Sequence, residues 1–172
     1  MRNLILLFLS VPAVVVAQDI TFPEALSGRF AQTREIRQAG ITLRSEGSFF
    51  INKSKGIKWV TEKPFNSTVT LSPGSAPTGG EAAKQLAAIM QGLLVQDYGV
   101  LSKYFNVTHG KKKKGFEVRL KTTDETIAQV FSEIVITGEK YIKTVILSNR
   151  QGDTTTIKFT DIRESASGFS DD

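Results

Sequence analysis

Residues 47–65 (GSFFINKSKGIKWVTEKPF) constrain the fold more than any other stretch, because two apolar runs alternate on either side of a short basic turn. In a strand, successive side chains point to opposite faces, so every second residue shares a face. The residues that share one face of each strand are Phe49, Ile51 and Lys53 before the turn and Ile57 and Trp59 after it. The stretch therefore predicts an antiparallel hairpin with one strongly apolar face.

Similar alternating runs recur along the chain, separated by glycine, proline and polar turns. The expected strands are residues 29–37, 42–52, 56–62, 65–71, 106–109, 116–121, 133–137, 141–148 and 154–162. Apolar residues at helical spacing predict a helix over 81–95 and a shorter one that begins near Asp97. The sequence TTDE at 122–125 resembles a helix cap and predicts one further turn of helix through Phe131. Strands, helices and strands in that order predict an α+β fold with an antiparallel sheet and helices on one face.

Several of the expected strands are apolar on both faces. In residues 141–148 the alternation places Val145 and Leu147 on one face and Ile142 and Ile146 on the other. A solvated antiparallel sheet alternates more cleanly, so the pattern indicates cover on both sides or a curved sheet with a filled interior. A cavity that admits an apolar ligand is a sharper interpretation of the same pattern.

The N-terminus has the pattern of an export signal. Residues 1–3 form a short basic start, residues 4–16 are an apolar run, and small residues precede Gln18. This pattern predicts a secretory signal peptide over residues 1–17 that is cleaved after Ala17. The apolar run is shorter than the about 20 residues that a membrane-spanning helix needs. We therefore expect one periplasmic domain over residues 18–163 and a polar tail over residues 164–172.

The composition offers little for catalysis. The chain has no cysteine and a single histidine, His109, which we expect in an exposed hairpin loop beside lysines. No His, Asp or Glu residues have metal-ligand spacing, so we expect no metal site and no enzyme activity. A net charge of +5 is too small to argue for nucleic-acid binding.

The lysine run at residues 111–114 is the densest charge feature of the sequence. As an exposed hairpin tip, it would keep neighbouring sheet edges apart. As a binding feature, it would contact anionic lipid or an acidic partner. Both interpretations stay open.

Three of these stretches together resemble a known family. They are GRFAQTREI at 28–36, SEGSFFINKSKGIKWVTEKPF at 45–65, and the closing order of strand, short helix and three strands, with its GDT turn, over 117–162. In them the chain resembles the outer-membrane lipoprotein carrier proteins, the LolA family. The resemblance implies an unclosed β-barrel, or half-barrel, whose concave face is covered by helices.

The resemblance also implies a function. Members of this family take up the acyl chains of lipoproteins from an inner-membrane ABC transporter and pass them to a receptor at the outer membrane, without a cofactor. We expect a monomer that binds acyl chains of lipoproteins or a related lipid. The cavity wall that we expect comprises Phe49, Ile51, Ile57, Trp59, Leu86, Met90 and Leu93. Lys53 stands where better-known members have an arginine that ties the lid helices to the barrel.

The chain departs from the family at several points. The stretch before Gly28 and the segment 72–80 are short, and nothing after Ile162 resembles the additional C-terminal elements. These departures predict a shortened, divergent member. Two alternatives therefore stay open: the apolar face is ordinary core, or the protein is a half-barrel that senses or scaffolds an envelope complex without carrying lipid.

Overall fold

A computed structural model describes residues 23–72, 89, 92, 93, 95 and 97–164 of the 172-residue chain. The expected signal peptide and residues 165–172 lie outside the described residues, as do Leu86 and Met90. In the described part, no helix is both long and apolar enough to cross a membrane.

In the part of the chain that the structure describes, nine strands form one sheet in which every neighbouring pair is antiparallel. They are β1 (Ala25–Ile36), β2 (Ile41–Asn52), β3 (Gly56–Lys63), β4 (Ser67–Leu71), β5 (Asn106–Lys111), β6 (Phe116–Lys121), β7 (Glu133–Gly138), β8 (Ile142–Ser148) and β9 (Thr154–Glu164). Their order across the sheet is β4-β3-β2-β1-β9-β8-β7-β6-β5. Two meanders, β1–β4 and β5–β9, are thus joined where the first strand pairs with the last.

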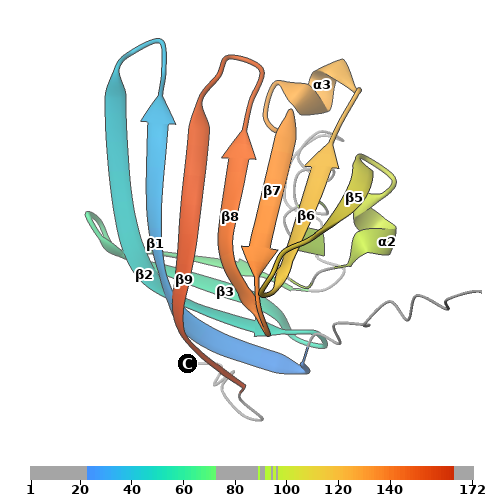
Figure 1. Ribbon diagram of the computed structural model, residues 1–172. Helices are drawn as coiled ribbons and strands as arrows, with labels where there is room; N and C mark the ends of the chain where they lie inside the picture. The colour runs from blue at the N-terminus through green and yellow to red at the C-terminus, as the bar shows by residue number, and fades with distance from the viewer. Residues whose placement is uncertain (1–22, 73–88, 90–91, 94, 96, 165–172) are drawn as a thin grey trace, which may run out of the picture.

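The sheet is curved but not closed, because β4 and β5 remain as its two edges (Figure 1). The short helix α2 (Tyr98–Leu101) lies beside β5 and β6, and α3 (Glu125–Ala128) lies at the end of the sheet where β6 connects to β7. The expected α+β fold with a single curved antiparallel sheet is therefore confirmed.

The interior of the curve is filled with apolar side chains. Strand register places Val118, Ile136 and Val145 in one row across β6, β7 and β8, and all three are buried. On the outer face of the same strands, Val135 is half-buried and Ile146 is 36% exposed. Strands that are apolar on both faces predicted either cover on both sides of the sheet or a curved sheet with a filled interior. The structure is a curved sheet with a filled interior.

The sequence pattern predicts the wrong face for Ile142. Thr137 pairs with Thr144, whereas Gly138 pairs with Ile142, so the register shifts by one residue at the start of β8. An extra residue in one strand reverses the alternation beyond it. Ile142 consequently joins Val145 in the core, while Ile146 faces outward.

The predicted short helix near Asp97 is confirmed as α2. The Asp97 side chain caps it by accepting a hydrogen bond of 3.0 Å from the Val100 N–H. The helix buries Leu101, and Phe105, just beyond it, is buried as well.

The helix predicted to reach Phe131 ends earlier, at Ala128, and its cap is Asp124 rather than Thr122. Asp124 accepts hydrogen bonds from the N–H groups of Thr126 and Ile127, both at 2.9 Å. Ser132 then donates its N–H to the carbonyl of Ser148, which returns the chain to the sheet.

The predicted hairpin loop at His109 is also wrong, because β5 continues through His109 to Lys111. Lys111 pairs with Phe116, which leaves only residues 112–115 for the turn, and Gly115 has a positive φ of 91° there. His109 is exposed, as expected, and its ring meets Tyr98 edge-on at a centroid distance of 5.3 Å.

Candidate functional site

The apolar face predicted for the 47–65 hairpin forms in the structure as the inner, concave face of β2 and β3. Phe49 pairs with Trp59, and Ile51 pairs with Ile57. Phe49, Ile51 and Ile57 are 4%, 3% and 1% exposed, whereas Trp59 is half-buried. Burial on one face fixes the register of the pair, because a slip of one residue would turn every one of these side chains outward.

Trp59 belongs to a cluster of four aromatic rings from four strands. Phe30 of β1 stacks on Trp59 with ring centroids 3.9 Å apart. Phe159 of β9 meets Phe49 and Trp59 edge-on at 5.2 and 6.2 Å. Sequence reasoning missed Phe30 and Phe159 as site residues, and only the pairing of β1 with β9, which aligns these two phenylalanines, brings them together.

Two glycines make room for this cluster. Gly47 pairs with Phe30, and a Cβ on Gly47 would lie 3.0 Å from the Phe30 ring and only 1.9 Å from the Val60 carbonyl oxygen. A Cβ on Gly28 would lie 2.8 Å from the Phe49 ring. The close packing of the rings therefore depends on bare backbone at both positions.

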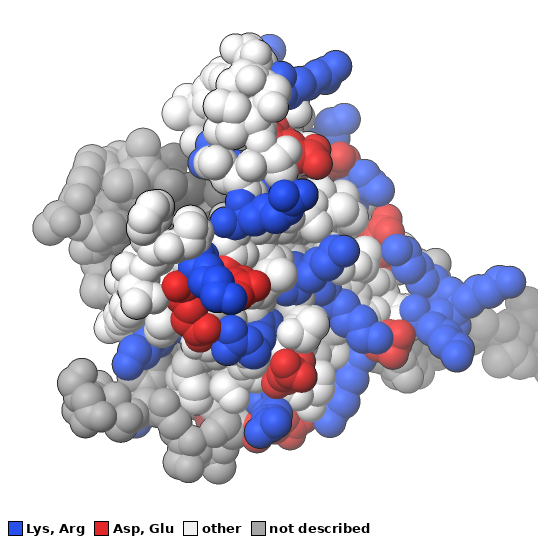
Figure 2. Space-filling model, turned by 90° about the vertical axis from the view of Figure 1, so that its left-hand side faces the viewer, with Lys and Arg blue, Asp and Glu red and all other residues white. Residues whose placement is uncertain are grey.

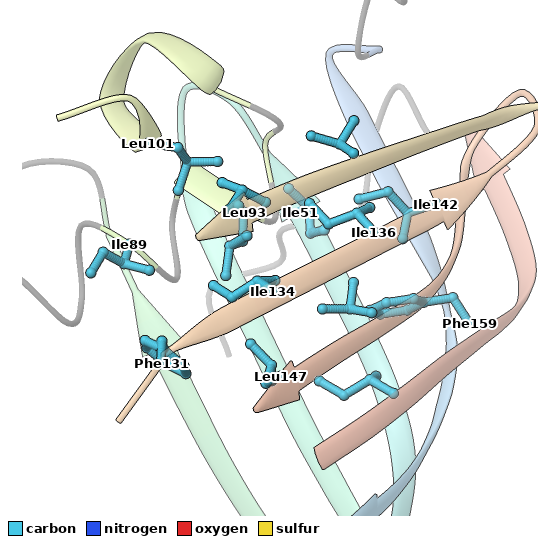
Figure 3. Packing of buried hydrophobic residues seen from close by; sticks show 14 of the residues in the cluster. Ile51, Ile89, Leu93, Leu101, Phe131, Ile134, Ile136, Ile142, Leu147 and Phe159 are labelled. Carbon is cyan, nitrogen blue, oxygen red and sulfur yellow. The ribbon is translucent and has the colours of Figure 1, made fainter. Parts of the chain in front are cut away.

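Side chains from described residues between 89 and 105 cover the concave face. Residues 89, 92, 93 and 95 are helical, and they lie next to α2 in the sequence. We call the described residues 89, 92, 93, 95 and 97–105 the cover. Ile89 and Leu93 are 1% and 3% exposed and belong to the same apolar cluster as Ile51 and Ile134 (Figure 3). Of the cavity-wall residues predicted on the helix, Leu93 therefore faces the predicted strand residues, and Leu86 and Met90 lie outside the described residues.

The concave face is apolar, and the core behind it holds few polar side chains. Among the described residues, Thr122 is the single buried polar side chain. Tyr98 stands beside the apolar cluster, and burial raises its pKa to about 12, so its hydroxyl remains protonated at neutral pH. The described residues include no group of three His, Cys, Asp or Glu side chains placed to hold a metal ion. What the face offers a ligand is apolar contact.

The apolar surface extends beyond its cover at two borders. Val69 of β4 pairs with Trp59 and is 52% exposed. At the far end of β2, Leu43 lies by alternation on the face of Phe49 and is 51% exposed. Two surface hollows, of about 470 and 270 Å³, include Phe49 and Phe159, respectively, in their linings, whereas Ile51, Ile57 and Trp59 line neither of them.

Lys53 lies in the turn between β2 and β3 rather than in a strand. Its backbone N–H donates to the Glu24 carbonyl oxygen at 3.0 Å. The side-chain Oδ1 of Asn52 accepts hydrogen bonds from the N–H groups of Ser54 and Lys55 and so fixes the turn. Lys53 thus stands at the end of the concave face where Ile51 and Ile57 lie, and its role as a lid tether stays a prediction.

No protein-family model matches the chain, and no curated protein matches it in sequence. Several solved structures are similar to it. A LolA superfamily protein from Nitrosomonas europaea is 8% identical, with a TM-score of 0.42 over 87% of this chain and 90% of that one. A domain described as an outer membrane lipoprotein-sorting protein, from Vibrio parahaemolyticus, is 9% identical, with a TM-score of 0.36 over 86% and 87%. A DUF1329 family protein from Desulfovibrio piger is 10% identical, with a TM-score of 0.30 over 88% and 90%.

Proposed function

We propose that this protein is a periplasmic carrier that binds the acyl chains of lipoproteins, or of a related lipid, on the concave face of its sheet. The observation that carries the proposal is an apolar concave face that is larger than its cover. Val69 and Leu43 continue that face into solvent at its borders, and Trp59 beside Val69 is half-buried. Exposed apolar surface of this kind marks a binding site in many proteins.

Uptake of a chain requires the cover to move away from the sheet. Ile89, Leu93 and Leu101 pack against strand residues through apolar contacts alone. An acyl chain that took their place would restore the same type of contact, so the exchange would cost little hydrophobic burial. The cover would then act as a lid. An inner-membrane ABC transporter as donor and an outer-membrane receptor as acceptor complete the proposal.

The tight packing of the same face favours a second function. Ile57, Ile89 and Leu101 are each at most 1% exposed, as in an ordinary closed core. A half-barrel with a permanently filled interior would serve as a sensor or scaffold in an envelope complex and would carry no lipid.

Native mass spectrometry of the exported, gently purified protein distinguishes the two functions. The carrier predicts a population with the added mass of an acylated molecule, which organic extraction removes. Val69→Gln should reduce that population, because it places an amide beside Trp59 on the binding face. Val130→Gln is the matched control, since Val130 is also exposed, at 49%, but outside the apolar cluster. A clean apo mass under gentle conditions would support the scaffold instead.

A further inference from the structure

A hollow of about 470 Å³ lies on the outer face of the sheet, across β3, β2, β1 and β9. Its lining includes Ser27 and Arg29 from β1, Lys58 from β3, and Asp161 and Arg163 from β9. Phe49 and Gly28 of the concave face also contribute to the lining, but the charged residues lie by alternation on the face opposite to Ile57 and Trp59. The acyl-chain site does not account for these charges. Its volume is in the range of small-molecule sites, about 300–1,000 Å³.

The hollow coincides with a bulge between β1 and β9. Ser27 pairs with Arg163, but Arg29 pairs with Thr160, so two residues of β9 stand opposite Gly28. One of them, Asp161, has a positive φ of 52°, the only such value among the described residues other than glycine. A bulge bends its strand and redirects the side chains next to it. The hollow is therefore shaped by the backbone bulge. Residues with a positive φ, such as Asp161, often accompany functional sites.

The strand register places one cation, Lys58 or Arg163, at each end of a row of residues that lines the hollow. Lys58 pairs with Phe50, Phe50 with Ser27, and Ser27 with Arg163, which makes one row across four strands. Neighbouring strands are about 4.8 Å apart, so the backbones of Lys58 and Arg163 are about 14 Å apart.

Arg29 adds a third cation from the neighbouring row. Its two terminal nitrogens donate to the Glu62 carboxylate at 3.3 and 2.8 Å, which holds the guanidinium in a fixed orientation. Lys58 and Arg163, in contrast, have no ion-pair partner among the residues that the structure describes. Glu62 offsets the charge of Arg29, and Asp161 is the single carboxylate among the described lining residues, so Lys58 and Arg163 leave the hollow with an excess of positive charge. Lys and Arg also outnumber Asp and Glu on the side of the molecule where β2 and β1 lie (Figure 2).

We propose that this hollow binds a phosphate ester. Guanidinium, ammonium and serine hydroxyl groups are the donors that phosphate oxygens accept in proteins. Phe50 and Val60, which also line the hollow, give the carbon skeleton of the ester an apolar surface. The ester is either a free small molecule or the headgroup of an anionic phospholipid. The inference does not depend on acyl-chain binding, which would take place on the other face.

Nuclear magnetic resonance titration with glycerol 3-phosphate tests the proposal on the unaltered protein. The inference predicts saturable shifts centred on the amides of Ser27, Arg29 and Arg163. Sedimentation with vesicles of phosphatidylglycerol, compared with phosphatidylcholine alone, is the second arm. Saturation by the soluble ester identifies a free ligand, and vesicle binding without such saturation identifies a lipid headgroup.

Matched double variants show whether the hollow itself is responsible. Lys58→Gln with Arg163→Gln should weaken binding of whichever probe binds by at least tenfold. Lys158→Gln with Arg44→Gln removes the same charge from exposed positions on the same face, outside the hollow, and should change binding less than twofold. Equal losses in both double variants would overturn the proposal, since only net charge would then matter. Absence of binding by both probes, or saturable shifts centred away from the hollow, would overturn it as well.

Discussion

At the scale of single residues, Gly47 has the most demanding position on the concave face. It lies beneath the Phe30 ring and next to the backbone of β3, where the Val60 carbonyl oxygen leaves no space for a side chain. The conformational freedom of glycine is not what this position requires, because its φ is not positive. The requirement is the absence of a Cβ.

Gly47→Ala should therefore lower the free energy of unfolding by about 1–3 kcal/mol, the usual cost of forcing extra volume into a packed region. Chemical denaturation measures this loss, and the emission of Trp59 should change in the native state as its ring moves relative to Phe30. Gly110→Ala is the control, since a Cβ there would meet its nearest atom at an ordinary 3.6 Å. If both variants were equally stable, close approach at Gly47 would not matter.

Residue-level predictions from the sequence succeeded where burial is one-sided. Phe49, Ile51, Ile57 and Trp59 were placed on one face by alternation alone, because their hairpin is local and its turn is short. Phe30 and Phe159 were missed because they lie near opposite ends of the sequence, and no local pattern shows that their strands pair.

At the scale of elements, the turn between β2 and β3 holds Lys53, the residue expected to tether the cover to the sheet. Lys53 lies in this turn, at the end of the face that the cover closes. If Lys53 tethers the cover, its side chain stabilises the closed state.

Lys53→Leu should then raise hydrogen exchange at residues 89, 92, 93 and 95, because opening of the cover would cost less free energy. Lys55→Leu is the matched control, since Lys55 is an exposed lysine of the same turn. Mass spectrometry of peptides from this region gives the exchange rates. The tether role would be rejected if exchange there were the same in both variants and in the parent protein.

Ion pairs on the outer face connect β6 to β7. Glu117 accepts hydrogen bonds from Lys112 and Arg119, which lower the pKa of its carboxyl below the ordinary value of 4.5, and Arg119 also contacts Glu133. A carboxyl whose pKa is lower in the folded state stabilises the fold above its unfolded pKa. That contribution is lost as the pH falls from about 4.5 through the lower, folded value.

Carbon-detected titration should therefore give Glu117 a pKa below 4.5, and Arg119→Gln should raise it, because one of its hydrogen-bond donors is removed. Glu117→Gln should also make stability less sensitive to pH in that window. A pKa at or above 4.5 in the parent protein would show that these contacts do not persist in solution.

Predictions at the element level failed where the backbone departs from regular alternation. The bulge opposite Gly138 moves Ile142 from the outer face into the core, and no residue near it signals the extra position. Strand β5 continued into the lysine run because cross-strand pairing with Phe116 outweighs the low strand propensity of lysine. The Asp97 cap, in contrast, was predictable because a capping aspartate is a local signal.

At the scale of the whole molecule, the open curve of the sheet creates the possibility of a binding function. Two meanders meet at β1 and β9, and their free edges β4 and β5 leave the curve unclosed. The order of strands and helices predicted the fold class, and the family resemblance supplied the open barrel, which the structure confirms. The acyl-chain site itself stays a prediction. A closed core and a covered cavity have the same pattern of apolar residues, so the filled interior does not distinguish them.

The emission of Trp59 tests the central claim most directly, since it is the only tryptophan of the chain and lies on the concave face beside the exposed Val69. Brominated fatty acids should quench it saturably, and unbrominated chains of the same length should reverse the effect. Far-ultraviolet circular dichroism should stay unchanged throughout, which confirms that the fold is intact. Weak quenching that never saturates, or lipid binding that leaves the emission of Trp59 unaltered, would contradict acyl-chain binding on this face.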